Sequence, residues 1–146
     1  MASITSANSI LMLSISSLYV VPQQLQGYAV EDVFDIDPLE IAETMMGVDG
    51  HLSAGYVNVP TKQGITLMAD SNANIIFDNW YISQKQLQDV YFANGSITLP
   101  SLGVVYTLTR GVLTTYQPAP NGKKVLQPRK HVITWESMTP SPIPGV

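Results

Sequence analysis

The chain has 146 residues, the size of one ordinary domain, and it contains no cysteine. Disulfide bonds, thiol catalysis and thiolate-bound zinc are therefore excluded. Charged residues make up only 12% of the chain, where about 25% is usual, and apolar residues make up 45%. A surface with so few charges is expected to be covered in large part by other protein chains.

The charges divide the sequence into an acidic part and a basic part. Residues 1–61 hold seven acidic and no basic residues, whereas residues 62–146 hold all seven Lys and Arg with four acidic residues, so the two parts carry −7 and +3. Unlike patches favour head-to-tail contact between identical subunits, although both patches could equally be solvated on one monomer. The net charge of −4 argues against a general nucleic-acid binder.

The first apolar stretch, residues 10–21, is predicted to be a strand. A secretory signal is less favoured because no basic residues precede it, and the stretch is shorter than the roughly 20 apolar residues of a membrane span. Alternation places Leu11, Leu13 and Ile15 on one side and Met12 and Ser14 on the other. Residues 1–9 are a candidate N-terminal arm.

The next segments predict extended chain, turns and one hairpin. Residues 28–36 look extended, and Asp37-Pro38 marks the entry to a loop. A mixed acidic and apolar segment follows over 39–50 and ends at the turn signal Asp49-Gly50. Alternation over 52–57 predicts a hairpin with residues 65–68, closed by a turn at 60–64.

A helix is predicted over about residues 71–93. Ser71 is a favourable N-cap, and no Pro or Gly follows until Gly95, which is typical of a residue that ends a helix. Phe77, Trp80 and Tyr91 lie close to one face of this helix. We expect these aromatic side chains to anchor the helix on a sheet.

The remainder of the chain returns to two-residue alternation. It predicts strands over 97–100, 104–116 and 125–137, with a turn over 118–122 between the last two. Residues 139–146 contain three prolines and are expected to form an extended tail. The predicted fold class is therefore mainly β (α+β), with one domain over 1–138: a sandwich or small barrel of antiparallel strands and one flanking helix.

No catalytic or metal-binding constellation stands out in the sequence. His51 and His131, its only histidines, lie 80 positions apart. Asp35 and Asp37 resemble the paired carboxylates of some metal sites, but further ligands are missing nearby. The nucleophile elbow and the phosphate-binding loop are absent too. We expect no enzyme, cofactor or metal, and a hydrolase using Asp35 or Asp37 with His51 is the enzymatic alternative.

Seven short stretches carry a family resemblance in chain order. They are VFDID at 33–37, MGVDGHLSAG at 46–55, FDNW at 77–80, VYFANGSITLPS at 90–101, LTRGVL at 108–113, KVLQPR at 124–129 and VITWE at 132–136. This ordered set resembles the tail tube proteins of tailed phages, especially those with contractile tails. The resemblance covers most of residues 33–138 and less of the two ends.

The resemblance implies a structural virion protein that assembles into stacked hexameric rings, the tail tube through which DNA reaches the host. Such families use a long hairpin or loop to reach the neighbouring ring, and the candidates here are residues 50–68 and 37–49. The implied partners are further copies of the chain, the sheath, tape measure, baseplate and tail terminator proteins, and passing DNA that is not specifically bound. The implied location is the phage tail, after synthesis in the host cytoplasm and without membrane insertion.

The expected functional residues are charged or aromatic. Inter-subunit contacts are expected from Asp37, Glu40, Glu43, Asp49, His51, Tyr56, Lys62, Arg110, Lys123, Lys124, Arg129 and Lys130. Tube lumens in such families are typically acidic, and Glu31, Asp32 and Asp35 are the lumen candidates. Two alternatives remain: a related ring-forming protein, such as a tail terminator or a secretion-system tube component, and a monomeric β-sandwich binding module.

Overall fold

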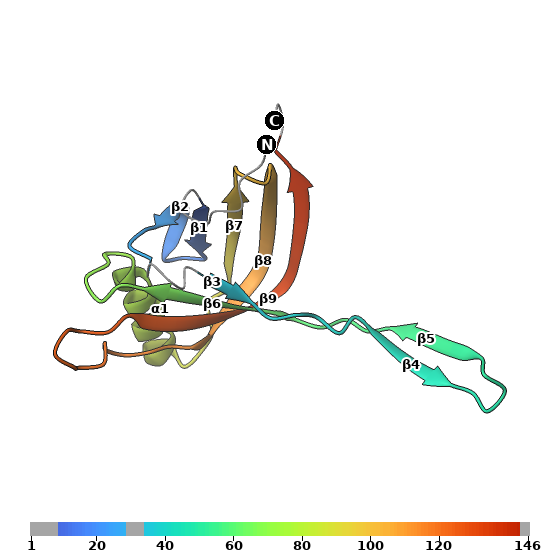
Figure 1. Ribbon diagram of the computed structural model, residues 1–146. Helices are drawn as coiled ribbons and strands as arrows, with labels where there is room; N and C mark the ends of the chain where they lie inside the picture. Colours follow the sequence, from blue (N-terminus) through green and yellow to red (C-terminus); the bar gives the residue numbers. More distant parts are fainter. Residues whose placement is uncertain (1–8, 29–33, 144–146) are drawn as a thin grey trace.

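The structure, a computed structural model, describes residues 9–28 and 34–143 and consists mainly of strands with one α-helix in that part of the chain (Figure 1). Seven strands form one antiparallel sheet in the order β2-β1-β7-β8-β9-β6-β3, and the other two form a separate hairpin. The predicted mainly β fold with one helix is confirmed. The elements are β1 (Ile10–Ile15), β2 (Tyr19–Leu25), β3 (Phe34–Ile36), β4 (Ala42–Met46), β5 (Leu52–Tyr56), β6 (Thr61–Leu67), α1 (Asn74–Leu87), β7 (Ala93–Leu99), β8 (Val104–Thr115) and β9 (Arg129–Pro142).

The large sheet bends sharply along β8 and β9 (Figure 1). In β8 the buried positions Leu108 and Gly111 are three residues apart, whereas regular alternation would place them two or four apart. The irregularity is a bulge at which Arg110 adopts a left-handed φ of 49°. The bend divides the sheet into two layers. The β7 layer contains β2, β1, β7, residues 104–109 of β8 and residues 137–142 of β9; the β6 layer contains β3, β6, residues 111–115 of β8 and residues 129–135 of β9.

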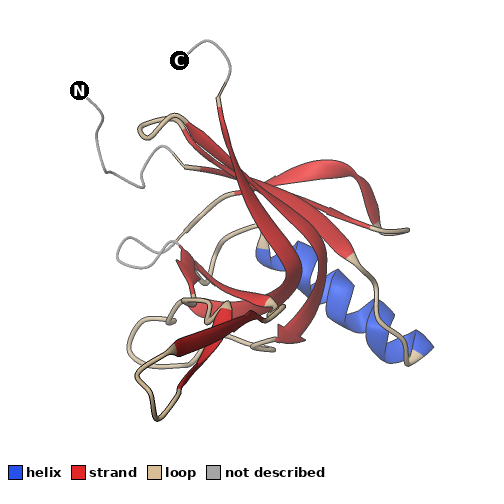
Figure 2. Cartoon of the chain, turned by 90° about the vertical axis from the view of Figure 1, so that its right-hand side faces the viewer, coloured by secondary structure: helices blue, strands red, loops and turns tan. Residues whose placement is uncertain are grey.

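The hydrophobic core lies between these two layers and α1, which Figure 2 shows as a single helix along one side of the curved sheet. Phe77 and Trp80 of α1 are completely buried. The alternation predicted for the first strand is confirmed in β1, since Leu11, Leu13 and Ile15 are at most 1% exposed. The predicted single strand over residues 10–21 is wrong, because a turn at 16–18 separates β1 from β2. The helix therefore anchors on the sheet through two of the three predicted aromatic residues, whereas Tyr91 lies beyond the end of the helix.

Two glycines of the sheet permit close packing beside one buried tryptophan. Trp135 is 1% exposed, and its indole N–H donates to Gln63 Oε1 at 2.9 Å. A Cβ on Gly111 would lie 2.4 Å from Trp135 Cε3, and one on Gly95 would lie 3.3 Å from Trp135 Cη2 and 2.7 Å from the Met12 carbonyl oxygen. Gly95 therefore lies inside β7 and permits close packing there; its predicted role in ending the helix is wrong.

The helix is also shorter than the predicted 71–93. It ends before Gln88, which has a left-handed φ of 53°. The indole of Trp80 donates to the Tyr91 carbonyl at 3.1 Å, and the Tyr91 N–H donates to Gln84 Oε1 at 3.1 Å. These two bonds fold residues 88–92 back beside the helix. At the other end, Ser71 Oγ accepts from the backbone N–H of residue 73 at 3.2 Å, one turn before the helix begins.

The predicted pairing of residues 52–57 with 65–68 is wrong. β5 pairs with β4 instead, through the turn at 47–50, where Gly50 has a φ of 83° and Asp49 Oδ1 accepts from the His51 N–H at 3.1 Å. β6 joins the large sheet between β9 and β3. Burial explains this difference, because Ile65 and Leu67 enter the core whereas every residue of β5 is exposed.

The last strand, β9, includes residues 139–142, which were predicted to belong to an extended tail. β6 pairs with β9 only as far as Trp135, so one edge of this last part is open. The Ile143 N–H donates to the Gly103 carbonyl at 2.9 Å, so the nitrogens of Pro140 and Pro142, at alternate positions, point toward the open edge. Proline is tolerated in a strand at such edge positions because no ladder hydrogen bond is lost.

Candidate assembly surface

The β4–β5 hairpin projects from the body of the molecule as an isolated two-stranded arm (Figure 1). Its pairing runs from Ala42 opposite Tyr56 to Met46 opposite Leu52, and all ten strand residues are exposed. A two-stranded hairpin without further packing is marginally stable in water. The arm is therefore a segment that gains stability when another surface covers it.

One side of this arm is almost entirely apolar. The apolar hairpin face comprises the pairs Ala42–Tyr56, Thr44–Ala54 and Met46–Leu52. Its three large side chains, Met46, Leu52 and Tyr56, are 64%, 59% and 77% exposed. The opposite side carries Glu43, Met45, Ser53 and Gly55. A contiguous exposed apolar face on a projecting arm is typical of a protein–protein contact.

The hairpin and its base collect half of the predicted contact residues. Asp37, Glu40, Glu43, Asp49 and His51 are all exposed there, together with Tyr56 of the apolar hairpin face. No lysine or arginine occurs on the chain before Lys62. The arm is therefore both apolar and acidic, which suits a partner surface that offers apolar area and positive charge.

The basic candidates are spread over the body of the protein. Lys62 lies in β6, and Lys123 and Lys124 lie in the loop after β8; all three are exposed. Arg110 lies at the bulge, with its guanidinium carbon 4.2 Å from the centre of the Phe92 ring. The structure therefore does not gather the predicted basic residues into one patch.

The predicted lumen residues have different outcomes. Asp35, in β3, forms an ion pair with Lys130 of β9 at 3.3 Å, and both side chains are more than half exposed. A pair this exposed contributes little to stability. Glu31 and Asp32 lie outside the described residues.

Arg129 is a correction to the predicted contact set, because it is 5% exposed and is used inside the molecule. Its guanidinium donates to Asp78 Oδ1 at 2.8 Å and to the Gln117 carbonyl at 3.1 and 2.8 Å. Although burial alone would raise the pKa of the Asp78 carboxyl, hydrogen bonds from Arg129 and from the Tyr116 hydroxyl lower it. The two ionic partners are 51 positions apart, so no local pattern indicated the pair.

His131 is a fully buried member of the same cluster. Its ring stacks on Phe77 at 4.4 Å between centroids. Nδ1 accepts from the Gln117 N–H at 3.4 Å, which leaves the Nε2 proton to be donated to Asn74 Oδ1 at 3.3 Å. Burial, with a further contribution from Arg129, lowers the pKa of His131 to about 4. The imidazole is therefore neutral at physiological pH and structural in role.

The hypothetical hydrolytic group is not assembled. His51 follows the turn at the far end of the hairpin, whereas Asp35 and Asp37 lie in and just after β3 at its base (Figure 1). Within residues 9–28 and 34–143, no group of three or more His, Asp or Glu could hold a metal ion. In the same part of the chain, no helix has the length and apolar character needed to span a membrane.

Comparison with protein families decides the family membership. Residues 2–139 match the family model described as "Tail fiber protein gp32". The chain belongs to this family. A search of curated proteins finds no match for the gp32-family chain.

Solved structures similar to the gp32-family chain come from contractile injection systems. A chain of the anti-feeding prophage baseplate, reconstructed with 6-fold symmetry, matches with a TM-score of 0.60 at 13% identity, over 99% of both chains. A chain of the anti-feeding prophage cap that terminates the tube matches with a TM-score of 0.56 at 12% identity, over 97% of this chain and 93% of that one. A chain of an extracellular contractile injection system sheath–tube complex in the extended state matches with a TM-score of 0.53 at 11% identity, over 91% and 88%. At these identities the matches establish a shared fold.

Together, the family and these neighbours identify a structural protein of the phage-tail type. The components named in the matched structures belong to multi-protein tail assemblies, so assembly with other tail proteins agrees with the shared fold. The expected absence of enzymatic activity agrees with the structural character of the family and its neighbours.

Proposed function

We propose that this chain is the repeating subunit of a phage tail tube, with copies arranged in hexameric rings that stack on one another. The observation that carries this proposal is the apolar hairpin face, where Met46, Leu52 and Tyr56 are each at least 59% exposed on an arm that no other part of residues 9–28 and 34–143 covers. Burial against a second copy removes this apolar area from water.

The charge distribution supports head-to-tail contact between copies. The hairpin and its base carry the acidic residues Asp37, Glu40, Glu43 and Asp49, and the exposed basic residues spread over the body of the next copy are Lys62, Arg110, Lys123, Lys124 and Lys130. In a heterologous interface, two different surfaces of the chain meet at every contact between copies. Opposite charges on these two surfaces set the register between the copies. We propose that the hairpin of one copy lies on the body of a copy in the adjacent ring.

The fold neighbours support the same assembly and its surroundings. One of them belongs to a sheath–tube complex, and another to a baseplate reconstructed with 6-fold symmetry. By analogy, the partners of this chain are a sheath, a tape measure protein, a baseplate and a terminator, and DNA passes through without specific binding. Residues 1–138 act as one assembling domain in the virion.

A second candidate function is a ring at an end of the tube. Two of the similar structures are a baseplate chain and a chain of the tube-terminating cap. The same hairpin contact then joins the ring to one neighbouring ring and does not repeat along an axis.

Electron microscopy of the purified protein, combined with light scattering after size-exclusion chromatography, tests the proposal. The tube subunit forms tubes of variable length whose mass is many times that of one chain. An end component forms isolated rings. Single chains that persist at high concentration contradict both functions and favour a monomeric binding module.

A further inference from the structure

The outward side of the β7 layer carries no charged residue. In β1 and β7 the residues on this side alternate with buried Leu11, Leu13 and Ile97; they are Ile10, Met12, Ser14, Asn94, Ser96 and Thr98. In β8 and β9 they are Val105, Thr107, Thr109, Ser137, Thr139 and Ser141. These twelve positions, termed the hydroxyl face, hold nine Ser, Thr or Asn side chains and three apolar ones.

The strand register aligns these polar side chains in rows across four strands. Met12 lies opposite Ser96, which lies opposite Thr107, which in turn lies opposite Thr139. The layer itself satisfies several of the hydroxyl groups. In the next row, where Thr109 lies opposite Ser137, Thr109 Oγ1 is 2.9 Å from Ser137 Oγ. The face therefore binds water readily and requires no protein partner to satisfy its polar groups.

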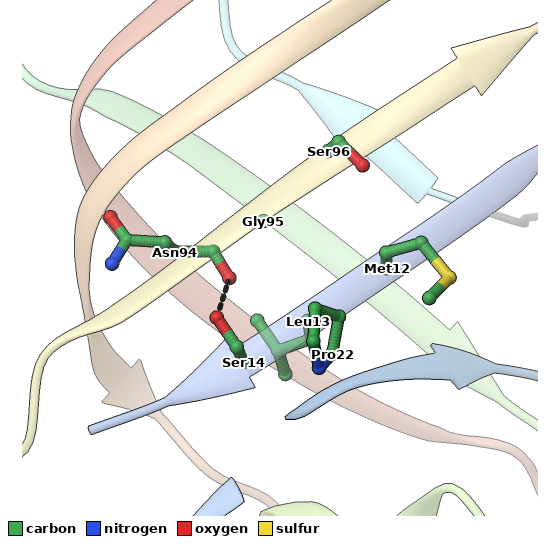
Figure 3. Close-up of a pocket in the computed structure, with 7 residues that line it drawn as sticks. All are labelled: Met12, Leu13, Ser14, Pro22, Asn94, Gly95 and Ser96. Carbon is green, nitrogen blue, oxygen red and sulfur yellow. Dashed lines mark hydrogen bonds between the residues drawn. The ribbon is translucent and has the colours of Figure 1, made fainter. Parts of the chain in front are cut away.

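A shallow hollow of about 340 Å³ lies on this face, and Figure 3 shows its lining. The hollow is lined by Met12, Leu13 and Ser14 of β1, Pro22 of β2 and Asn94, Gly95 and Ser96 of β7, and Ser14 Oγ donates to the Asn94 carbonyl at 3.3 Å. The lining contains no aromatic side chain and no charge. Protein–protein contacts depend on buried aromatic and arginine anchors, and this face offers neither.

The hydroxyl face thus differs from both kinds of ordinary surface. A solvated monomer surface normally carries about a quarter or more charged residues, and an interface carries apolar anchors such as those of the hairpin. We propose that the hydroxyl face is the wall of the passage inside the tube and that it lets a nucleic-acid polyanion move along it without binding. This inference rests on the proposed tube function and names the surface that the passing polymer meets.

The chemistry of the face fits a passage for a polyanion. Phosphate groups bind proteins mainly through Lys and Arg, and none of the twelve positions of the hydroxyl face is either. Arg110 borders the face, where its backbone N–H donates to Asn94 Oδ1 at 3.1 Å, and its guanidinium carbon lies 4.2 Å from the centre of the Phe92 ring. Hydroxyl groups hold water, and none of the twelve positions carries an aromatic ring on which exposed bases could stack. The proposed wall is therefore neutral at these twelve positions, whereas the lumen candidates Glu31, Asp32 and Asp35 are acidic; Glu31 and Asp32 lie outside the described residues. Asp35 lies on the β6 layer, where it pairs with Lys130.

Because the chain lacks cysteine, single thiols report directly on this location. We would prepare Ser96→Cys and Thr107→Cys, and label each as assembled tubes and as unassembled chains. The reagents are a small maleimide dye and a maleimide attached to a globular protein too wide to enter a tube. Both thiols should react with both reagents in unassembled chains, and with the small reagent alone in tubes.

Two labelling results would overturn the inference. Reaction of tube-borne thiols with the protein-sized reagent places the face on the outside, and loss of reaction with the small dye places it in an interface between copies. If the wild-type protein forms no tubes, the proposed tube function itself is contradicted. This outcome is distinguishable from both labelling results, which require tubes to form.

A charge substitution tests the passage of a polyanion. Tubes of Thr107→Lys should retain a labelled single-stranded DNA in sedimentation at low salt, at least about tenfold more than tubes of the size-matched Thr107→Gln, and high salt should release it. Wild-type tubes should retain as little as Thr107→Gln. Equal retention by the lysine and glutamine tubes, or strong retention by wild-type tubes, would refute the neutral passage.

Discussion

Replacing the two apolar side chains beside the hairpin turn, Met46→Ser with Leu52→Ser, should prevent assembly and leave the single chain folded. Burying a Met or Leu side chain completely is worth about 1.5–3 kcal/mol. Because the two are 64% and 59% exposed in the free chain, covering them gains about 1–2 kcal/mol each. The double substitution should therefore cost about 2–4 kcal/mol per contact, which corresponds to roughly a 30- to 1,000-fold weaker association.

The assay is the concentration at which the protein first sediments as polymer, measured beside thermal unfolding of the unassembled chain. The critical concentration should rise by the factor above, while the free energy of unfolding changes by less than about 0.5 kcal/mol, as expected for exposed positions. Met45→Ser, on the opposite side of the same arm, is the matched control and should weaken assembly less. Equal effects of Met45→Ser and the double substitution would refute the role of the apolar hairpin face.

Three further predictions concern the body of the protein. Arg129→Met leaves Asp78 without its cation and should lower the free energy of unfolding in urea by about 2–4 kcal/mol; a loss below about 1 kcal/mol would contradict a stabilising ion pair. His131 has a pKa of about 4 when folded against about 6.5 when unfolded, so the unfolded chain binds more protons between these values. Stability is therefore complete above about pH 6.5 and should fall by up to about 3 kcal/mol as the pH drops to 4, measured by urea unfolding at several pH values. His131→Gln should flatten this slope, and an unchanged slope would assign it to other groups. Gly111→Ala places a Cβ 2.4 Å from the indole ring of Trp135 and should lower the free energy of unfolding by about 1–3 kcal/mol, measured by thermal unfolding. The control Gly122→Ala, whose Cβ meets nothing within 4 Å, should leave stability unchanged. Equal losses in the two variants would contradict the packing role of Gly111.

The alternation of apolar and polar residues predicted the strands that place one side in the core of this chain. Leu11, Leu13 and Ile15 of β1 are buried as predicted, and β8 ends at Thr115, one residue before the predicted end. The aromatic anchors Phe77 and Trp80 were predicted correctly, because their spacing reflects burial against the sheet. In these elements the local pattern and the tertiary environment agree.

The errors arose where contacts distant in the chain decide the structure. The helix ends early because Trp80 and Gln84 bind the backbone of Tyr91, and propensity alone does not encode such bonds. Gly95 is needed because the Met12 carbonyl oxygen, 83 positions earlier in the chain, lies 2.7 Å from where a Cβ would be. The burial of Arg129 depends likewise on Asp78, and no alternation pattern reports an ion pair across the fold.

The hairpin was mispaired for a different reason. Neither strand of the arm packs on the core of its own chain, so residues 42–46 and 52–56 carry no pattern that a monomer core would impose. The turn signal at Asp49-Gly50 was recognised, but the pairing it closes was assigned to another segment. Under the proposed function, the apolar positions of the arm are selected by the surface of another copy.

The central claim is that each chain completes its surface by placing the β4–β5 hairpin on another copy of itself. A cryo-electron microscopy reconstruction of the assembled protein tests this claim most directly. We predict stacked six-fold rings in which Met46, Leu52 and Tyr56 are buried against a neighbouring copy. An assembly in which these three side chains remain in solvent would contradict the account.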